Sequence, residues 1–141
     1  MITVEPTSDR EYILSVLTEP EMYAAVRGDG PENPQEAVQG FLAPGVEHFR
    51  VQVDGQDAGL FSFVDMGESV DVHASLLKNC RGRKAIDAGK IVLERAKQLG
   101  RPLTTCVVPS CKYAMWYVHQ FGFKPLPPIP GFNVVRLGLI T

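Results

Sequence analysis

Apolar residues recur with a helical period in some segments of this chain and with a strand period in others, and this pattern predicts the elements. A first strand is expected over residues 2–5, followed by a helix that begins after Ser8 or Asp9 as its N-cap. The apolar face of this helix consists of Tyr12, Ile13, Val16 and Leu17. Further helices are expected over residues 19–26, 35–42, 85–99 and 110–120.

Strands are expected over residues 48–53, 59–64, 70–77, 103–108 and 132–139, where β-branched and aromatic residues gather. Asp54-Gly55 is a hairpin turn signal between the first two of these strands. Residues 27–34 are rich in Gly, Pro, Asp and Asn and are typical of a loop. Three successive strands joined by turns predict an antiparallel meander. We expect a mixed α/β fold with a mostly antiparallel central sheet flanked by helices.

A cationic turn, Arg81-Gly82-Arg83-Lys84, stands between the strand expected over 70–77 and the helix expected over 85–99. The first amides of a helix have no intrahelical acceptor, and the helix dipole places partial positive charge there. Basic side chains oppose this dipole, so three of them are unfavourable unless an anion or an acidic partner compensates. The turn therefore predicts a diphosphate site, and a solvated helix start is the alternative.

Length, charge and cysteine content narrow the class of protein. A chain of 141 residues suits a single domain over 1–141, and its net charge of −2 does not favour nucleic acid. No run approaches the roughly 20 apolar residues of a membrane span, and the N-terminal residues do not resemble a secretory signal. Three cysteines and three scattered histidines indicate neither disulfides nor a metal site. We expect a cytoplasmic protein with no metal and no membrane partner.

Two short motifs occur in a fixed order behind the expected meander. Arg81-Gly82-Arg83-Lys84-Ala85-Ile86 stands first, and Gln120-Phe121-Gly122-Phe123 ends the last helix. Together with the order of elements they resemble the GNAT N-acetyltransferase superfamily, and the compact size resembles members encoded by bacteriophages. That family's pyrophosphate loop reads Arg or Gln, x, x, Gly, x, Gly or Ala, so Lys84 and Ile86 replace both glycines here. The second motif corresponds to the family's Leu-Gly-Phe.

The resemblance implies acetyl-CoA as co-substrate. The amides of residues 82–86, namely Gly82, Arg83, Lys84, Ala85 and Ile86, would face its pyrophosphate, and the Arg81 and Arg83 side chains would add charge-assisted contacts. In the family the strand before this loop splays from the next strand and holds the pantetheine arm. By analogy Leu76, Leu77 and Lys78 would supply backbone contacts. The Lys84 side chain would either crowd the diphosphate or reach the ribose phosphate.

Acyl transfer to an amine requires a base, and the strand over 70–77 offers two candidates. Its alternation places Val70, Val72, Ala74 and Leu76 on one face. Asp71, His73 and Ser75 share the other face. Because this strand carries a general base in many family members, we expect His73 first and Asp71 second in this role. Ordinary polar residues on a solvated strand face are the alternative.

The general acid is harder to assign. Val118 occupies the place of the family's tyrosine, and Tyr117 is turned from it by about 100° on a helix. Tyr117 is the candidate acid, with Tyr113 and His119 as neighbours. The alternatives are that the thiolate leaves without a proton donor or that the domain binds without catalysing. Cys111, at the start of the same helix, is an alternative acyl carrier, although a lone cysteine has no paired base in the sequence.

Three readings of the function stay open. The first is acetyl transfer from acetyl-CoA to a small-molecule or peptide amine in a ternary complex, with a homodimer left open. The second is a catalytically inactive coenzyme A-binding or assembly module with the same fold. The third, a nucleotide-binding domain of another fold, conflicts with the antiparallel meander. Acidic residues of the helical region, Glu19, Glu21, Asp29 and Glu32, would favour a cationic acceptor.

Overall fold

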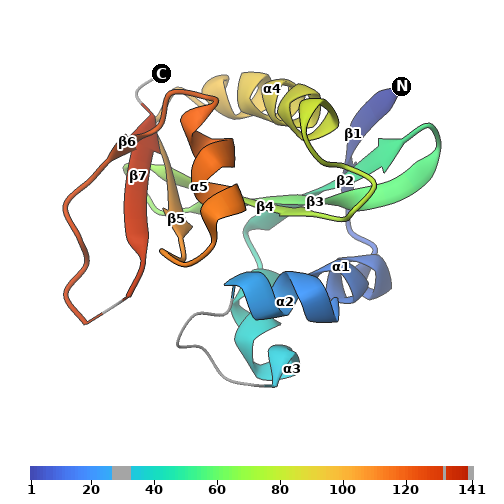
Figure 1. Ribbon diagram of the computed structural model, residues 1–141, viewed down its shortest axis with the longest axis horizontal. Coiled ribbons are helices and arrows are strands. Elements are labelled where there is room, and N and C mark those ends of the chain that lie inside the picture. The colour runs from blue at the N-terminus through green and yellow to red at the C-terminus, as the bar shows by residue number, and fades with distance from the viewer. Residues whose placement is uncertain (27–32, 132, 140–141) are drawn as a thin grey trace.

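The computed structural model describes residues 1–26, 33–131 and 133–139. In these residues seven strands form one sheet in the order β1-β2-β3-β4-β5-β7-β6 (Figure 1). Neighbouring strands are antiparallel except for β4 and β5, which are parallel. The strands are β1 (Ile2–Thr7), β2 (Val46–Val53), β3 (Gln56–Asp65), β4 (Val70–Leu76), β5 (Leu103–Val107), β6 (Lys124–Pro125) and β7 (Val135–Leu139). The predicted mostly antiparallel mixed sheet is therefore confirmed.

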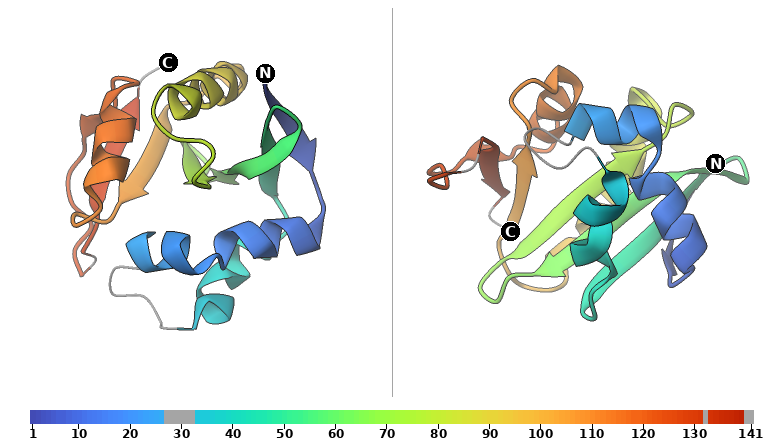
Figure 2. Two further views of the ribbon diagram at one scale, coloured as in Figure 1. Left: turned by 45° about the vertical axis from the view of Figure 1, so that its right-hand side comes forward. Right: turned by 90° about the horizontal axis from the view of Figure 1, so that it is seen from below.

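Helices cover both faces of this sheet, as Figures 1 and 2 show. They are α1 (Arg10–Leu17), α2 (Pro20–Val26), α3 (Pro34–Ala37), the 3-10 helix η1 (Val38–Leu42), α4 (Arg83–Lys97) and α5 (Lys112–His119). The first four lie on one face, and α4 and α5 lie on the other. A core cluster that includes Val92 and Leu103 lies under α4 and α5, and a second one, which includes Val16 and Leu60, lies under α1 and η1.

The helix α1 begins and packs as the sequence predicts. The Asp9 side chain accepts a hydrogen bond of 3.1 Å from the backbone N–H of Tyr12, which makes Asp9 the N-cap. The Tyr12 hydroxyl donates to the carbonyl of Gly59 on β3. A Cβ on Gly59 would lie 2.5 Å from the Ser75 carbonyl oxygen, and its φ is +144°, so the close approach of β3 and β4 requires glycine here.

The turn between β2 and β3 is the predicted two-residue hairpin turn. Asp54 and Gly55 have φ values of +51° and +80°, which match a type I′ turn. Val53 pairs with Gln56, so β3 begins three residues before the expected residue 59. The pairing shifts register where Gln52 pairs with Asp57 but Val51 pairs with Gly59, so the expected strand from residue 59 corresponds to the part of β3 beyond this irregularity.

Several element boundaries differ from the prediction. The helix expected over 35–42 is a short α3 followed by η1, and the last strand begins at Val135 rather than at residue 132. Residues 27–32 of the expected loop and Phe132 lie outside the described residues. The two-residue strand β6 pairs with β7 and was not predicted, because the prolines around it interrupt any strand period.

The strands β4 and β5 pair only where they begin. Val70 pairs with Leu103 and Asp71 with Thr104, and the Thr105 hydroxyl donates to the Val72 carbonyl at 2.8 Å. No further β4–β5 pair follows in the described residues, although β4 continues to Leu76 and β5 to Val107. A gap between two parallel strands therefore opens in the middle of the sheet.

Candidate active site

A chamber of about 320 Å³ occupies the gap between β4 and β5, and we call it the inter-strand chamber. Side chains from both faces of the sheet line it, since His73 and Phe41 contribute on the η1 side and Val92 on the α4 side. Its apolar walls include Phe61, Val72, Leu93, Val118, Phe121 and Phe123. The chamber therefore gives the two faces of the sheet a common interior space, where a ligand would meet groups from both.

A second cavity of about 760 Å³ lies at the mouth of this chamber, and we call it the outer cleft. It runs between α2, the end of β4, the turn before α4 and the start of α5. Its walls include Met22, Leu77, Arg81 and Tyr113. Four residues line both cavities, namely Ala74, Cys111, Ala114 and Tyr117. The two cavities are therefore contiguous.

The turn from Arg81 to Ile86 leads into α4, as the sequence predicts, although α4 begins at Arg83 rather than at the expected residue 85. Gly82 is the N-cap with φ +59°, and no side chain caps this helix. The Ile86 amide donates to the Gly82 carbonyl at 3.1 Å, so the three amides between them, those of Arg83, Lys84 and Ala85, have no acceptor within the helix. The Gly82 amide is already taken, because it donates to the Tyr113 hydroxyl at 3.1 Å.

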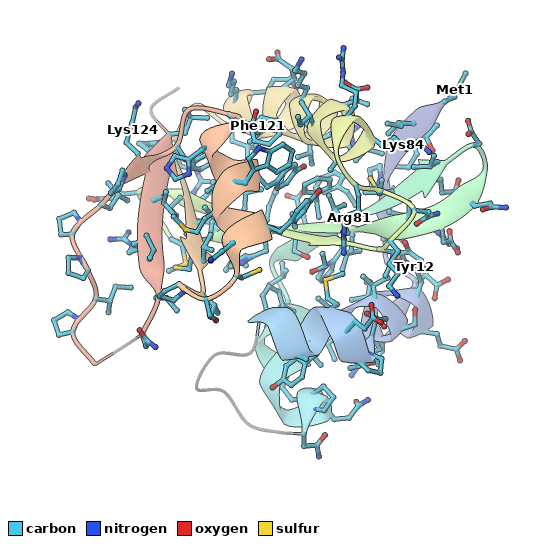
Figure 3. The ribbon with its side chains drawn as sticks, viewed as in Figure 1. Met1, Tyr12, Arg81, Lys84, Phe121 and Lys124 are labelled. Carbon is cyan, nitrogen blue, oxygen red and sulfur yellow. The ribbon has the colours of Figure 1, made fainter. Side chains whose placement is uncertain are left out.

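The cationic side chains of this turn point in different directions. Arg81 extends into the outer cleft, where its guanidinium donates to the Leu76 carbonyl and lies 5.2 Å from the centre of the Tyr113 ring (Figure 3). Arg83 pairs with Asp87 one turn along α4, at 3.3 Å between exposed groups. The pKa of the Asp54 carboxyl is lowered mainly by its hydrogen bond to the N-terminal ammonium, and to a smaller extent by the nearby charge of Lys84. Acidic partners thus compensate part of the charge that opposes the helix dipole.

The end of β4 uses some of the backbone groups that were expected to hold the coenzyme arm. The Leu76 carbonyl accepts from Arg81, and the Leu77 amide donates to the Ala58 carbonyl at 2.8 Å. The Lys78 ammonium pairs with Glu21 at 2.9 Å across the entrance of the outer cleft. The backbone contacts of Leu76, Leu77 and Lys78 to a coenzyme remain a prediction.

His73 and Asp71 lie together on the face of β4 that turns toward η1. Their closest side-chain atoms, Nε2 and Oδ2, are 3.7 Å apart, and the Thr104 hydroxyl donates to the other carboxylate oxygen of Asp71. The edge of the Phe41 ring packs on the imidazole at a centroid distance of 5.1 Å. Because His73 also lines the inter-strand chamber, the structure brings a base with an adjacent carboxylate to the chamber wall. Its catalytic role stays a prediction.

Tyr117 is buried between α5 and α4, where its hydroxyl donates to the Ala85 carbonyl at 2.6 Å. Burial raises the pKa of this phenol far above its usual value, which weakens it as a proton donor. Its ring is parallel to that of Tyr113 and meets Phe121 edge to face. These contacts give Tyr117 a structural role beside the predicted catalytic one.

Sequence reasoning missed two features of this site. Tyr113 was only a neighbour of Tyr117, yet its hydroxyl holds the Gly82 amide. The sequence shows Val118 only as the residue that replaces the family's tyrosine, whereas the structure places it in the chamber wall. Its one-turn spacing from Ala114, another small residue, was the available signal. Cys111, the alternative acyl carrier, is the N-cap residue of α5 and a free cysteine.

Among the described residues, none of the helices has both the length and the apolar character that crossing a membrane requires.

Known proteins resemble this chain in structure, whereas none of the family models or curated proteins matches its sequence. A domain from Methanocaldococcus jannaschii has a TM-score of 0.80 at 10% identity, over 99% of this chain and 97% of that chain. The Campylobacter jejuni N-acetyltransferase PseH, in complex with acetyl coenzyme A, has a TM-score of 0.66 at 17% identity, over 99% of each chain.

The GNAT domain of S. lividans PAT has a TM-score of 0.74 at 15% identity, over 98% of this chain and 88% of that domain. Identities this low establish the fold alone, and these comparisons give no support to a bacteriophage origin. The structural match nevertheless extends over 98–99% of this chain in all three comparisons. This protein therefore has the fold of the GNAT acyltransferases.

Proposed function

We propose that this protein transfers an acyl group, acetyl in the simplest case, from acyl-coenzyme A to an amine in a ternary complex. One observation carries the proposal: the gap between β4 and β5 leads through the outer cleft to Arg81, and three amides without an intrahelical acceptor follow two to four residues later at the start of α4. A coenzyme along this path presents its thioester to the chamber and its diphosphate to the helix start. The shared fold with an N-acetyltransferase that binds acetyl coenzyme A supports this placement.

His73 is the base of the proposed reaction. It takes a proton from the acceptor ammonium, directly or through water, and the freed amine nitrogen forms a bond to the thioester carbonyl carbon. Asp71, 3.7 Å away, stabilises the imidazolium that results. The nitrogen then gives up its second proton to water, the carbon–sulfur bond breaks, and the coenzyme leaves as a thiol after the sulfur receives a proton. Tyr117 is the proposed donor, although its hydroxyl must first leave the Ala85 carbonyl.

The acceptor is a small-molecule or peptide amine that enters through the outer cleft. Two acids on the cleft wall are already engaged, because Glu19 accepts from the Met22 amide at 2.8 Å and Glu21 pairs with Lys78. The other acidic residues considered for a cationic acceptor, Asp29 and Glu32, lie outside the described residues. The charges on the cleft wall therefore add little to acceptor selection. We propose only that the acceptor carries an amine, and not that the rest of the molecule is cationic. A homodimer stays a prediction.

Calorimetric titration with acetyl-CoA tests the coenzyme site. Replacing Arg81→Ala removes the cation of the turn that extends into the outer cleft. Loss of one charge-assisted phosphate contact is expected to weaken binding by about tenfold to 150-fold, which corresponds to about 1.5–3 kcal/mol. Lys97→Ala, at the opposite end of α4, is the matched control and should bind as the wild type does. Equal affinity of the Arg81 variant would contradict the assignment.

A coenzyme-binding module without catalysis is the second candidate. It is favoured by the Tyr117 hydroxyl, which is bonded to the Ala85 carbonyl inside the protein. The two functions differ in one measurement, the release of free thiol from bound acetyl-CoA in the presence of a panel of primary amines. Saturable binding without thiol release above the uncatalysed rate for any amine would favour the module.

A further inference from the structure

The inter-strand chamber continues beyond the place where the two cavities meet. Ala74, Cys111, Ala114 and Tyr117 mark this boundary, because they line both cavities. Past them the chamber walls are mainly aliphatic and aromatic, and its polar groups lie chiefly on the β4 and β5 strands. The thioester of a coenzyme that lies in the outer cleft therefore reaches the chamber with its acyl group first.

Small residues on α5 and α4 keep this chamber open. Ala114 and Val118 are one turn apart on α5 and both line the chamber. On α4, Gly89 lies directly beneath aromatic rings, since a Cβ added there would be 2.4 Å from the Phe121 ring and 2.5 Å from the Tyr117 hydroxyl. The large rings thus rest against the α4 backbone. A larger residue at position 118 would instead occupy the chamber.

The size of the chamber exceeds the needs of an acetyl group. An apolar cavity of roughly 150 Å³ accepts benzene, which corresponds to about 25 Å³ for each carbon atom. The two carbons of an acetyl group therefore take up about 50 Å³ of the 320 Å³ chamber, which leaves room for a longer acyl chain beside an acceptor amine that reaches His73. On the side of α4 and α5, the side chains of Val92, Leu93, Val118 and Phe121 offer water no hydrogen-bond partners, so a hydrocarbon chain is a better occupant of that side than solvent.

We infer that the acyl donor of this protein is a coenzyme A thioester with an acyl chain longer than acetyl, of about four to eight carbons. The inference rests on the proposed function, because it takes the coenzyme to lie in the outer cleft. The acyl chain passes Ala114 and lies against Val118 and Phe121 inside the inter-strand chamber. Val118, which stands where the family has a tyrosine, thereby determines donor length.

Calorimetry with free coenzyme A and with its acetyl, butanoyl, hexanoyl and octanoyl thioesters tests this inference. Each buried methylene group contributes about fourfold in affinity, so hexanoyl-CoA is expected to bind at least about tenfold more tightly than acetyl-CoA. Val118→Phe fills the chamber and should reduce this preference to about twofold or less. Val118→Leu adds a single methylene group and should reduce it partly, which keeps the test available if the phenylalanine variant does not fold.

His119→Phe is the matched control, because it adds a ring to the same helix at an exposed position outside both cavities. It should keep the full preference for hexanoyl-CoA. Equal binding of acetyl-CoA and hexanoyl-CoA by the wild type would overturn the inference and leave the proposed function standing. A preference that persists in Val118→Phe would also overturn it, since the chain would then bind elsewhere. Failure to bind any of these ligands would overturn the proposed function itself.

Discussion

His73 combines the features of a general base more closely than any other described residue of the chamber wall. Asp71 lies 3.7 Å from its Nε2 atom, and the Thr104 hydroxyl fixes the carboxylate from β5. A carboxylate held in this way stabilises the protonated imidazole that forms when the amine is deprotonated. The pair is therefore suited to the role that we propose for His73.

Replacing His73→Ala should lower turnover by about 100-fold or more, once an acceptor has been found, because the proton of the ammonium loses its acceptor. Affinity for acetyl-CoA, measured by calorimetry, should change little, since His73 is not part of the turn that we propose to hold the diphosphate. His119→Ala, at an exposed position on α5, is the control. Unaltered turnover would return His73 to the role of an ordinary polar strand residue.

For single residues, the sequence predicted which side chains share one face of a strand. Alternation along β4 places Asp71 and His73 on one face, and the structure confirms that they are neighbours. Alternation could not predict the exposure of Ala74, which faces the two cavities rather than a closed core. The sequence also could not predict the contact between the Tyr113 hydroxyl and the Gly82 amide, because it joins residues 31 positions apart.

At the scale of elements, one phenol connects α5 to the first turn of α4. The Tyr117 hydroxyl donates to the Ala85 carbonyl at 2.6 Å, and its ring packs against Phe121 at a centroid distance of 5.0 Å. Replacing Tyr117→Phe keeps the ring packing and removes one hydrogen bond. The free energy of unfolding, measured in urea, should fall by about 1 kcal/mol.

The same variant separates the structural role of Tyr117 from its proposed catalytic role. If the hydroxyl protonates the leaving sulfur, thiol release should fall far more than the change in stability explains. Thiol release at the wild-type rate would leave Tyr117 with the structural role alone. Tyr113→Phe is the comparison, because it removes a neighbouring hydroxyl that is bonded to the Gly82 amide instead.

Elements with a strong local signal were predicted well, and elements that depend on a distant partner were not. Asp54-Gly55 determines its hairpin through two positive φ values, and Asp9 determines the start of α1. In contrast, β6 exists because Lys124 and Pro125 lie beside β7, a partner that no local pattern of two residues reveals.

At the scale of the whole molecule, a buried histidine couples folding to pH. His48 lies under η1, with Nδ1 2.8 Å from the Ser62 hydroxyl and Nε2 2.7 Å from the Phe41 carbonyl. Burial lowers the pKa of His48 below its ordinary value of about 6.5. As pH falls below that value, the unfolded chain takes up a proton that the folded protein excludes.

The free energy of unfolding contributed by His48 is therefore fully present above about pH 6.5 and is lost as pH falls through the lowered pKa. The slope for one proton is at most about 1.4 kcal/mol per pH unit. Urea unfolding at pH 7.5 and pH 5.0 measures the loss. His48→Gln cannot titrate and should lose less stability between these two values. An equal loss in both proteins would exclude His48 as the source.

The cavities are the part of the molecule that the sequence predicted least. The resemblance to a known family implied a gap between β4 and β5, but the volume of the chamber depends on Val118, Gly89 and Phe61 together. These residues belong to three elements, and each is unremarkable alone. A cavity is defined by the absence of side chains, so it becomes visible only when all its walls are in place.

The contact between the Tyr113 hydroxyl and the Gly82 amide also places the turn before α4 close to an intrinsic fluorophore. Trp116 is the single tryptophan of the chain, and its ring lies 5.4 Å from that of Tyr113. A diphosphate bound as proposed at the amides of Arg83, Lys84 and Ala85 would lie beside the Tyr113–Gly82 contact, and it is therefore expected to change the surroundings of the indole. Occupancy of the turn can then be followed by the intrinsic emission of an unlabelled protein, even before any acceptor is known.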